Sequence, residues 1–254
     1  MHQFHDALVS FAERRVIIMK TIGLIGGMSW ESTIPYYSII NEYVKKTLGG
    51  LHSAKIILYS VEFDEIEKCQ STGNWEKSAD ILGDAACKLE KAGADMLLIC
   101  TNTMHKVYSQ IQSHVSVPVI HIADATADAL QKDRVSKVAL LGTRYTMRED
   151  FYKSRLIDRG FEVLIPENED IDIVNRIIFD ELCVGEIKDD SRREFIRIIE
   201  NVASKGAEAV ILGCTEIGLL VGEKDSPIAI YDTTIIHATK AAQMALDGDG
   251  VMGP

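Results

Sequence analysis

An internal repeat limits the possible folds of this chain more than any other feature of its sequence. Residues 93–103, GADMLLICTNT, align without a gap on residues 206–216, GAEAVILGCTE. Each copy has Gly-Ala-acid, then an apolar run, then a short polar end. A weaker match sets residues 22–27 on residues 138–143, and the two matches occur in the same order at similar separations along the chain. The repeat therefore predicts two similar halves.

Short apolar runs predict the strands of both halves. They alternate with stretches whose charged residues have helical spacing, such as 75–91, 148–159 and 191–205. Because the runs are apolar throughout, we expect parallel sheets covered by helices on both faces. The predicted fold is α/β, with two similar parallel-sheet domains related by pseudo-twofold symmetry and an active site in the cleft between them. The predicted strands are 21–25, 55–61, 96–100, 117–122, 138–141, 163–165, 209–212 and 228–230.

The repeat also predicts the domain boundaries. The first α/β domain is expected to span 19–117, and the second 118–228. Residues 229–247 are predicted to return to the first domain, and residues 1–18 are interpreted as an N-terminal extension.

Charge and cysteine content exclude several classes of protein. The chain has 27 Lys and Arg against 38 Asp and Glu, a net charge of −11. This balance disfavours nucleic acid and anionic membranes as partners. No window approaches the roughly 18 apolar residues of a membrane span, and the first 18 residues lack the pattern of a signal peptide, so a cytoplasmic location is expected. The five cysteines are expected to be free thiols, since their number is odd and they lack zinc-site spacing.

The repeat places Thr101 and Cys214 at equivalent strand ends. If the halves face each other, these two side chains lie on opposite sides of one cleft, as a two-base racemisation requires. A cysteine at a helix N-terminus has a lowered pKa and is a good proton acceptor, and Cys214 is predicted to lie at such a position. The alternative interpretation of Cys214 is a buried apolar residue that ends a strand.

The neighbours of Thr101 have several interpretations. Cys100 points away from the side that Thr101 faces, because side chains alternate along a strand, and it is interpreted as core packing. The polar residues 101–103 are expected to cap the next helix or to hold a ligand. His105 is either a second proton carrier or a surface helix residue.

The glycine-rich turn at residues 26–30 follows the first predicted strand. It lacks the spacing of a nucleotide-binding loop. We expect its two glycines to let backbone N–H groups approach a carboxylate at the next helix N-terminus. An acid would then be bound without added positive charge.

From residue 19 to about residue 246, the sequence resembles the cofactor-independent aspartate/glutamate racemase family. The motifs that carry the resemblance are residues 20–30, 101–105 and 212–218. The likeness is greatest to the bacterial racemases specific for L-aspartate and L-glutamate, because Thr101 stands where most aspartate racemases have cysteine.

The resemblance implies that Thr101 and Cys214 are the catalytic proton donor and acceptor. It implies that Gln70 contacts the distal carboxylate, where aspartate racemases have arginine, and that Cys183 replaces a substrate-binding lysine. It further implies an acidic amino acid as substrate, no pyridoxal phosphate, no metal and a homodimer. The residues implied around the substrate are Met28, Gln70, Asn102, Thr103, Thr215 and Glu216.

A threonine in place of cysteine predicts an unequal reaction cycle. A hydroxyl is a much weaker acid than a thiol, so Cys214 should take the α-proton of the L-enantiomer and D-substrates should react poorly. Other enzymes of the superfamily are alternatives, namely a hydantoin racemase, a maleate isomerase or a decarboxylase. A small-molecule binding protein with two α/β halves is the alternative from a different class.

Overall fold

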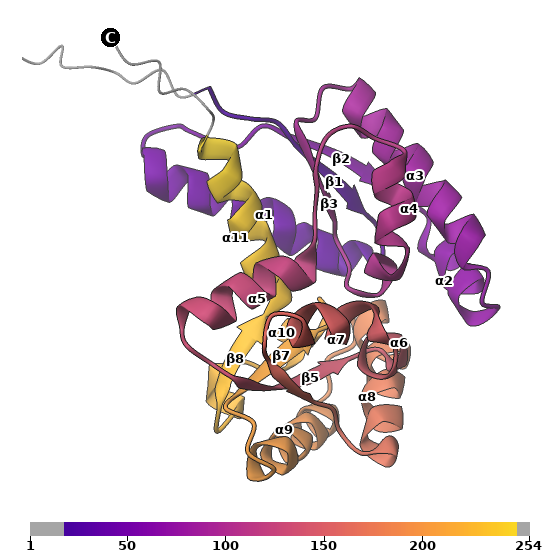
Figure 1. The fold of residues 1–254 in the computed structure, drawn as a ribbon, viewed down its shortest axis with the longest axis vertical. Helices are drawn as coiled ribbons and strands as arrows, with labels where there is room; N and C mark the ends of the chain where they lie inside the picture. Colours follow the sequence, from indigo (N-terminus) through magenta and orange to yellow (C-terminus); the bar gives the residue numbers. More distant parts are fainter. Residues whose placement is uncertain (1–17, 248–254) are drawn as a thin grey trace, which may run out of the picture.

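Two four-stranded parallel sheets form the framework of the protein (Figure 1). The structure is a computed structural model and describes residues 18–247. It confirms the predicted fold class, and each predicted strand overlaps an observed one. The strands are β1 (Ile22–Gly26), β2 (Ile56–Ser60), β3 (Met96–Ile99), β4 (Val119–Ile120), β5 (Lys137–Gly142), β6 (Glu162–Leu164), β7 (Ala209–Gly213) and β8 (Ala229–Asp232).

The two sheets have the same topology. The strand order is β2-β1-β3-β4 in the first sheet and β6-β5-β7-β8 in the second. The sequence repeat therefore corresponds to β3 and β7, which occupy the same place in their sheets. Its weaker copy corresponds to β1 and β5, which also match.

Helices cover both faces of each sheet. The predicted helix 148–159 is observed at 150–157, and the extended backbone of Glu149 separates it from a short helix that ends at Arg148. The helices are α1 (Trp30–Leu48), α2 (Phe63–Ser71), α3 (Trp75–Lys91), α4 (Tyr108–Ser113), α5 (Ile122–Lys132), α6 (Arg144–Arg148), α7 (Asp150–Ile157), α8 (Asn168–Asp180), α9 (Asp189–Ser204), α10 (Ile217–Leu220) and α11 (Thr233–Leu246), with 3₁₀ turns η1 (Thr103–Val107), η2 (Leu182–Val184) and η3 (Glu223–Asp225).

The C-terminal segment joins the two halves. Strand β8 pairs with β7 in the second sheet, whereas α11 runs from there to pack against α1 of the first half (Figure 1). Of residues 229–247, only helix α11 returns to the first half. Residues 229–232 do not, because their backbone pairs with β7 and completes the second sheet. A stripe of alanines allows this close packing: Ala238, Ala241, Ala242 and Ala245.

The boundary predicted between residues 117 and 118 does not coincide with the division between the sheets, because Val119 and Ile120 form β4 of the first sheet. The other domain limits remain predictions. Of the proposed N-terminal extension, residues 1–17 lie outside the described residues. Between residues 18 and 247, the protein has no helix with the length and apolarity needed to cross a membrane.

Candidate active site

Thr101 and Cys214 follow β3 and β7 at the carboxyl ends of the two parallel sheets, where ligands of such sheets bind. Their exposed fractions are 8% and 7%. The matched topology thus places the two residues at equivalent points of the two halves, and both lie among polar side chains that connect these halves.

The carboxylate of Glu216 lies at the centre of these connections. Its Oε2 accepts hydrogen bonds from the Cys214 thiol at 3.0 Å and the Thr215 hydroxyl at 2.9 Å. Its Oε1 accepts from the Ser29 hydroxyl at 2.8 Å and the Ser29 backbone N–H at 3.3 Å. The Cys183 thiol lies 3.9 Å from the same oxygen. Glu216 therefore links the end of β7 to the N-terminus of α1.

The expectation of a lowered Cys214 pKa is wrong. Burial raises the pKa of this thiol well above its usual value, and the Glu216 charge raises it further. Helix α10, which follows, has only four residues, and Glu216 lies between it and the thiol. Cys214 is therefore a neutral thiol that donates to Glu216.

The glycine-rich turn before α1 holds a carboxylate in a different way from the one expected. The Gly27 N–H donates to the Thr33 hydroxyl at 2.9 Å, so it is occupied within the turn. Gly27 has φ +89°, and a Cβ there would lie 2.3 Å from the Val61 carbonyl oxygen, so the position requires glycine. The carboxylate at this helix N-terminus is that of Glu216, bound by Ser29.

The polar residues after β3 contact residues that directly follow strands of the second sheet, instead of capping η1. The Asn102 amide donates to the Thr233 hydroxyl at 3.0 Å, and the Thr103 and Thr143 hydroxyls are 3.0 Å apart. The Asn102 Oδ1 is buried and has no hydrogen-bond partner within residues 18–247. This oxygen is a free acceptor beside Thr101 in the chain.

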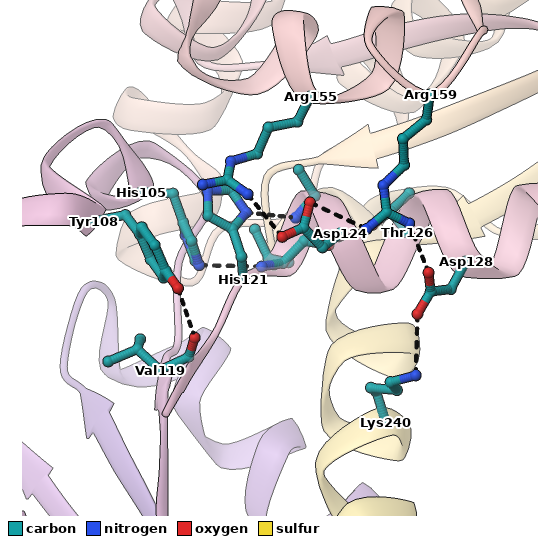
Figure 2. A network of polar contacts seen from close by, with 12 residues as sticks. His105, Tyr108, Val119, His121, Asp124, Thr126, Asp128, Arg155, Arg159 and Lys240 are labelled. Atoms are coloured by element: carbon teal, nitrogen blue, oxygen red, sulfur yellow. Dashed lines mark hydrogen bonds and ion pairs between the residues drawn. The ribbon is translucent and has the colours of Figure 1, made fainter. Parts of the chain in front are cut away.

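His105 is neither a surface residue nor a free proton carrier. Its Nδ1–H donates to the Thr101 carbonyl at 2.9 Å, and its Nε2 accepts from the Ile122 N–H at 3.2 Å. Burial lowers its pKa to about 3. Figure 2 shows the ring beside those of Tyr108 and His121, and its centroid is 4.5 Å from that of His121. His105 therefore ties the Thr101 loop to the start of α5, and Cys100 is confirmed as a core residue.

Gln70 and Met28 are both buried on the side of the first half. The Gln70 amide donates to the Met104 sulfur at 3.1 Å, and the Gln70 backbone carbonyl accepts from the Tyr145 hydroxyl at 3.1 Å. Met28 packs in the core cluster that contains Met104. Burial and the charges of nearby Glu216 and Glu31 raise the pKa of the Cys183 thiol.

Sequence reasoning missed three residues of this region, namely Ser29, Thr143 and Tyr145. Ser29 lies in the motif at 20–30, and Thr143 aligns with Gly27 in the weaker repeat, so both had a signal. Tyr145 had none. In the described part of the chain, no cluster of three His, Cys, Asp or Glu has the arrangement of a metal site.

Comparison with known proteins gives consistent matches. The sequence model of the Asp/Glu/hydantoin racemase family matches residues 25–241. The broad specificity amino-acid racemase RacX of Bacillus subtilis is 26% identical over 84% of this chain and 92% of its own length. The structure of a candidate Asp/Glu racemase from Yersinia pestis is 52% identical, with a TM-score of 0.83, over 90% of this chain and all of that one. An aspartate racemase homologue from Pyrococcus horikoshii is 39% identical, with a TM-score of 0.77, over 89% and 99%.

Proposed function

Because the chain belongs to the Asp/Glu/hydantoin racemase family, we propose that it interconverts the enantiomers of aspartate or glutamate without a cofactor. The observation that carries this proposal is the placement of Thr101 and Cys214 at equivalent strand ends of two matching sheets. Binding alone does not call for a proton-transferring group from each half. The similarity to proteins named as aspartate or glutamate racemases supports the choice of substrate.

The proposed first step begins with the neutral Cys214 thiol. When the substrate binds, the thiol proton passes to Glu216 Oε2, 3.0 Å away, and leaves a thiolate. The thiolate then takes the α-proton of the L-enantiomer, and the electron pair of the broken C–H bond remains on the substrate. In this proposal the Cys214 thiolate forms because Glu216 accepts the thiol proton, and not because a helix N-terminus lowers the pKa of the thiol.

In the second step, the Thr101 hydroxyl delivers a proton to the opposite face of the α-carbon. Solvent replaces that proton at the same time, because a threonine alkoxide is too basic to persist. Glu216 gives the thiol proton back to solvent, so the cycle ends with Cys214 as a thiol, Glu216 as a carboxylate and Thr101 as a hydroxyl. This requirement favours the reaction from the L-enantiomer.

Neutral groups hold the substrate in this proposal. The hydroxyls of Thr103 and Thr143, 3.0 Å apart, supply donors for the α-carboxylate and for the charge that develops beside it. The Thr215 hydroxyl, which donates to Glu216 in the free protein, turns to the substrate once Glu216 has taken the thiol proton. The free Oδ1 of Asn102 is an acceptor for the α-ammonium group. Such a pocket reconciles an acidic substrate with a chain of net charge −11.

A racemase of broader specificity is the second candidate. Gln70 and Cys183 add no positive charge near the site, which weakens selection for a distal carboxylate. The decisive experiment is a racemisation assay with L-aspartate, L-glutamate and several neutral L-amino acids, read by chiral chromatography. Turnover of the acidic pair alone supports the first candidate, turnover of all supports the second, and no turnover refutes both. A homodimer and a cytoplasmic location remain predictions.

A further inference from the structure

One group of side chains joins the two halves beside Gln70. Tyr145 on α6, in the second half, donates its hydroxyl hydrogen to the Gln70 carbonyl at 3.1 Å. Gln70 lies in the last turn of α2, where backbone carbonyls lack helical partners. The Gly73 N–H also donates to this oxygen, at 3.1 Å. The tyrosine therefore binds the end of the helix that carries Gln70.

Two further contacts hold Tyr145 in this position. Its ring packs edge-on against Trp75, with centroids 5.2 Å apart and planes at 82°. The Lys106 ammonium lies 3.9 Å from the centroid of the Trp75 ring and 2.6 Å from Glu149 Oε2. Trp75 and Lys106 belong to the first half, whereas Tyr145 and Glu149 belong to the second. We call these four residues the rim contact.

The charged side chains of the rim contact are more exposed than the residues of the candidate site. The Lys106 and Glu149 side chains are 24% and 35% exposed, whereas Gln70 is 5% exposed. Contacts of this kind between partly exposed side chains are individually weak, so they can part and form again. Gln70, Thr101 and Cys214 are nearly buried, so a substrate can reach them only when the side chains that cover them move.

We propose that Tyr145 is a positioning residue, which fixes Gln70 from the opposite half and is itself held by the other three residues of the rim contact. The rim contact parts to admit the substrate and forms again once the substrate is bound. The assignment of Gln70 to the substrate's distal end rests on the proposed function. Tyr145 therefore acts on the affinity for acidic amino acids, and the proton transfers at Cys214 and Thr101 proceed independently of it.

The first test removes one hydroxyl. Tyr145→Phe should raise the KM for L-glutamate about tenfold and leave kcat within about twofold, since one hydrogen bond to a buried group is lost. Tyr108→Phe is the matched control, because Tyr108 also donates to a backbone carbonyl, that of Val119, at 3.1 Å but within the first half. Equal effects of the two variants, or a fall in kcat without a change in KM, would overturn the proposal.

The second test needs no enzymatic activity. The chain has two tryptophans, so Trp30→Phe leaves Trp75 as the only one. In that background, Glu149→Gln should increase acrylamide quenching of Trp75 fluorescence at least twofold. Glu167→Gln, which removes the charge from an ion pair with Lys205 elsewhere in the second half, should not. Unchanged quenching in both variants refutes the rim contact.

The two tests separate this inference from the proposed function. Increased quenching in an enzyme that racemises no amino acid leaves the rim contact standing and refutes the racemase. Racemisation with unchanged KM in Tyr145→Phe and unchanged quenching in Glu149→Gln refutes the inference alone.

Discussion

The Cys214 thiol donates its hydrogen to the Glu216 carboxylate across 3.0 Å, so the proposed base carries its proton in the free protein. Because the Glu216 charge raises the pKa of this thiol, Glu216→Gln should lower it. We expect the pH midpoint of Cys214 alkylation by iodoacetamide to fall, measured by peptide mass spectrometry. Cys87 in the same digest is the internal control.

The same variant should nevertheless be a poor enzyme. Glutamine cannot take the thiol proton, so kcat should fall about 100-fold or more, the usual contribution of a general base. A more reactive thiol together with slower racemisation would distinguish proton transfer to Glu216 from simple electrostatic inhibition. If the alkylation midpoint stays in place, the carboxylate does not control the thiol.

Replacement of Cys214 tests the catalytic assignment directly. Cys214→Ser keeps a donor to Glu216 but has a hydroxyl in place of an acidic thiol. We therefore expect racemisation to fall by about three orders of magnitude or more, with an unchanged thermal unfolding midpoint. Cys87→Ser changes a thiol that binds only the His114 carbonyl and should retain full activity. Comparable activity in the two variants would refute the assignment.

The identity of residue 101 should determine which enantiomer reacts. In deuterated water, the wild-type enzyme should exchange the α-hydrogen of L-glutamate at least tenfold faster than that of D-glutamate, because Cys214 can become a thiolate when the substrate binds, whereas the Thr101 hydroxyl is too weak an acid to become an alkoxide. Thr101→Cys should bring the two initial rates within a few-fold of each other, as followed by NMR. Equal rates in the wild-type enzyme would exclude the unequal cycle.

The internal repeat made the two matching sheets and the positions of the residues at their strand ends predictable from the sequence. Thr101 and Cys214 follow equivalent apolar strands, so their placement at two sheet ends could be inferred from spacing alone. The protonation state of Cys214 could not, because it depends on burial and on how the Glu216 side chain folds back onto the thiol. The contact between Tyr145 and Gln70 joins residues 75 positions apart and follows from the way the halves pack, which no local pattern encodes.

Three buried histidines predict loss of stability in mild acid. Burial lowers the pKa of His105 to about 3 and of His237 to about 4, and it also lowers the pKa of His121. The unfolded chain takes up these protons near pH 6.5, whereas the folded protein does not, so stability is complete above pH 6.5 and falls below it. Between neutral pH and pH 5, the protonation of His105 and of His237 in the unfolded chain should each lower the free energy of unfolding by about 2 kcal/mol.

A single substitution can isolate one of these protons. The His237 Nε2–H donates to the Ile120 carbonyl at 2.9 Å and its Nδ1 accepts from the Tyr36 hydroxyl at 3.0 Å, so glutamine can supply both groups. In His237→Gln, the difference in urea unfolding free energy between pH 7.5 and pH 5 should shrink by about 2 kcal/mol. His52→Gln, at an exposed position, should leave that difference unchanged. An unchanged difference in both would mean that His237 is protonated in the folded protein.

Cys183 provides the test of why the site lacks a cation. Its thiol lies 3.9 Å from Glu216 Oε1, so a lysine there would bring an ammonium group next to the proposed site. A charge-assisted hydrogen bond from this ammonium group should strengthen binding of the substrate whose distal carboxylate it reaches. We expect that substrate to be aspartate, because the resemblance implies a substrate-binding lysine at this position in aspartate racemases. We expect Cys183→Lys to raise the ratio of kcat/KM for L-aspartate over L-glutamate about tenfold, close to the effect of one such bond. Cys183→Met has a similar length without the charge, so an equal change in that variant would attribute the effect to shape.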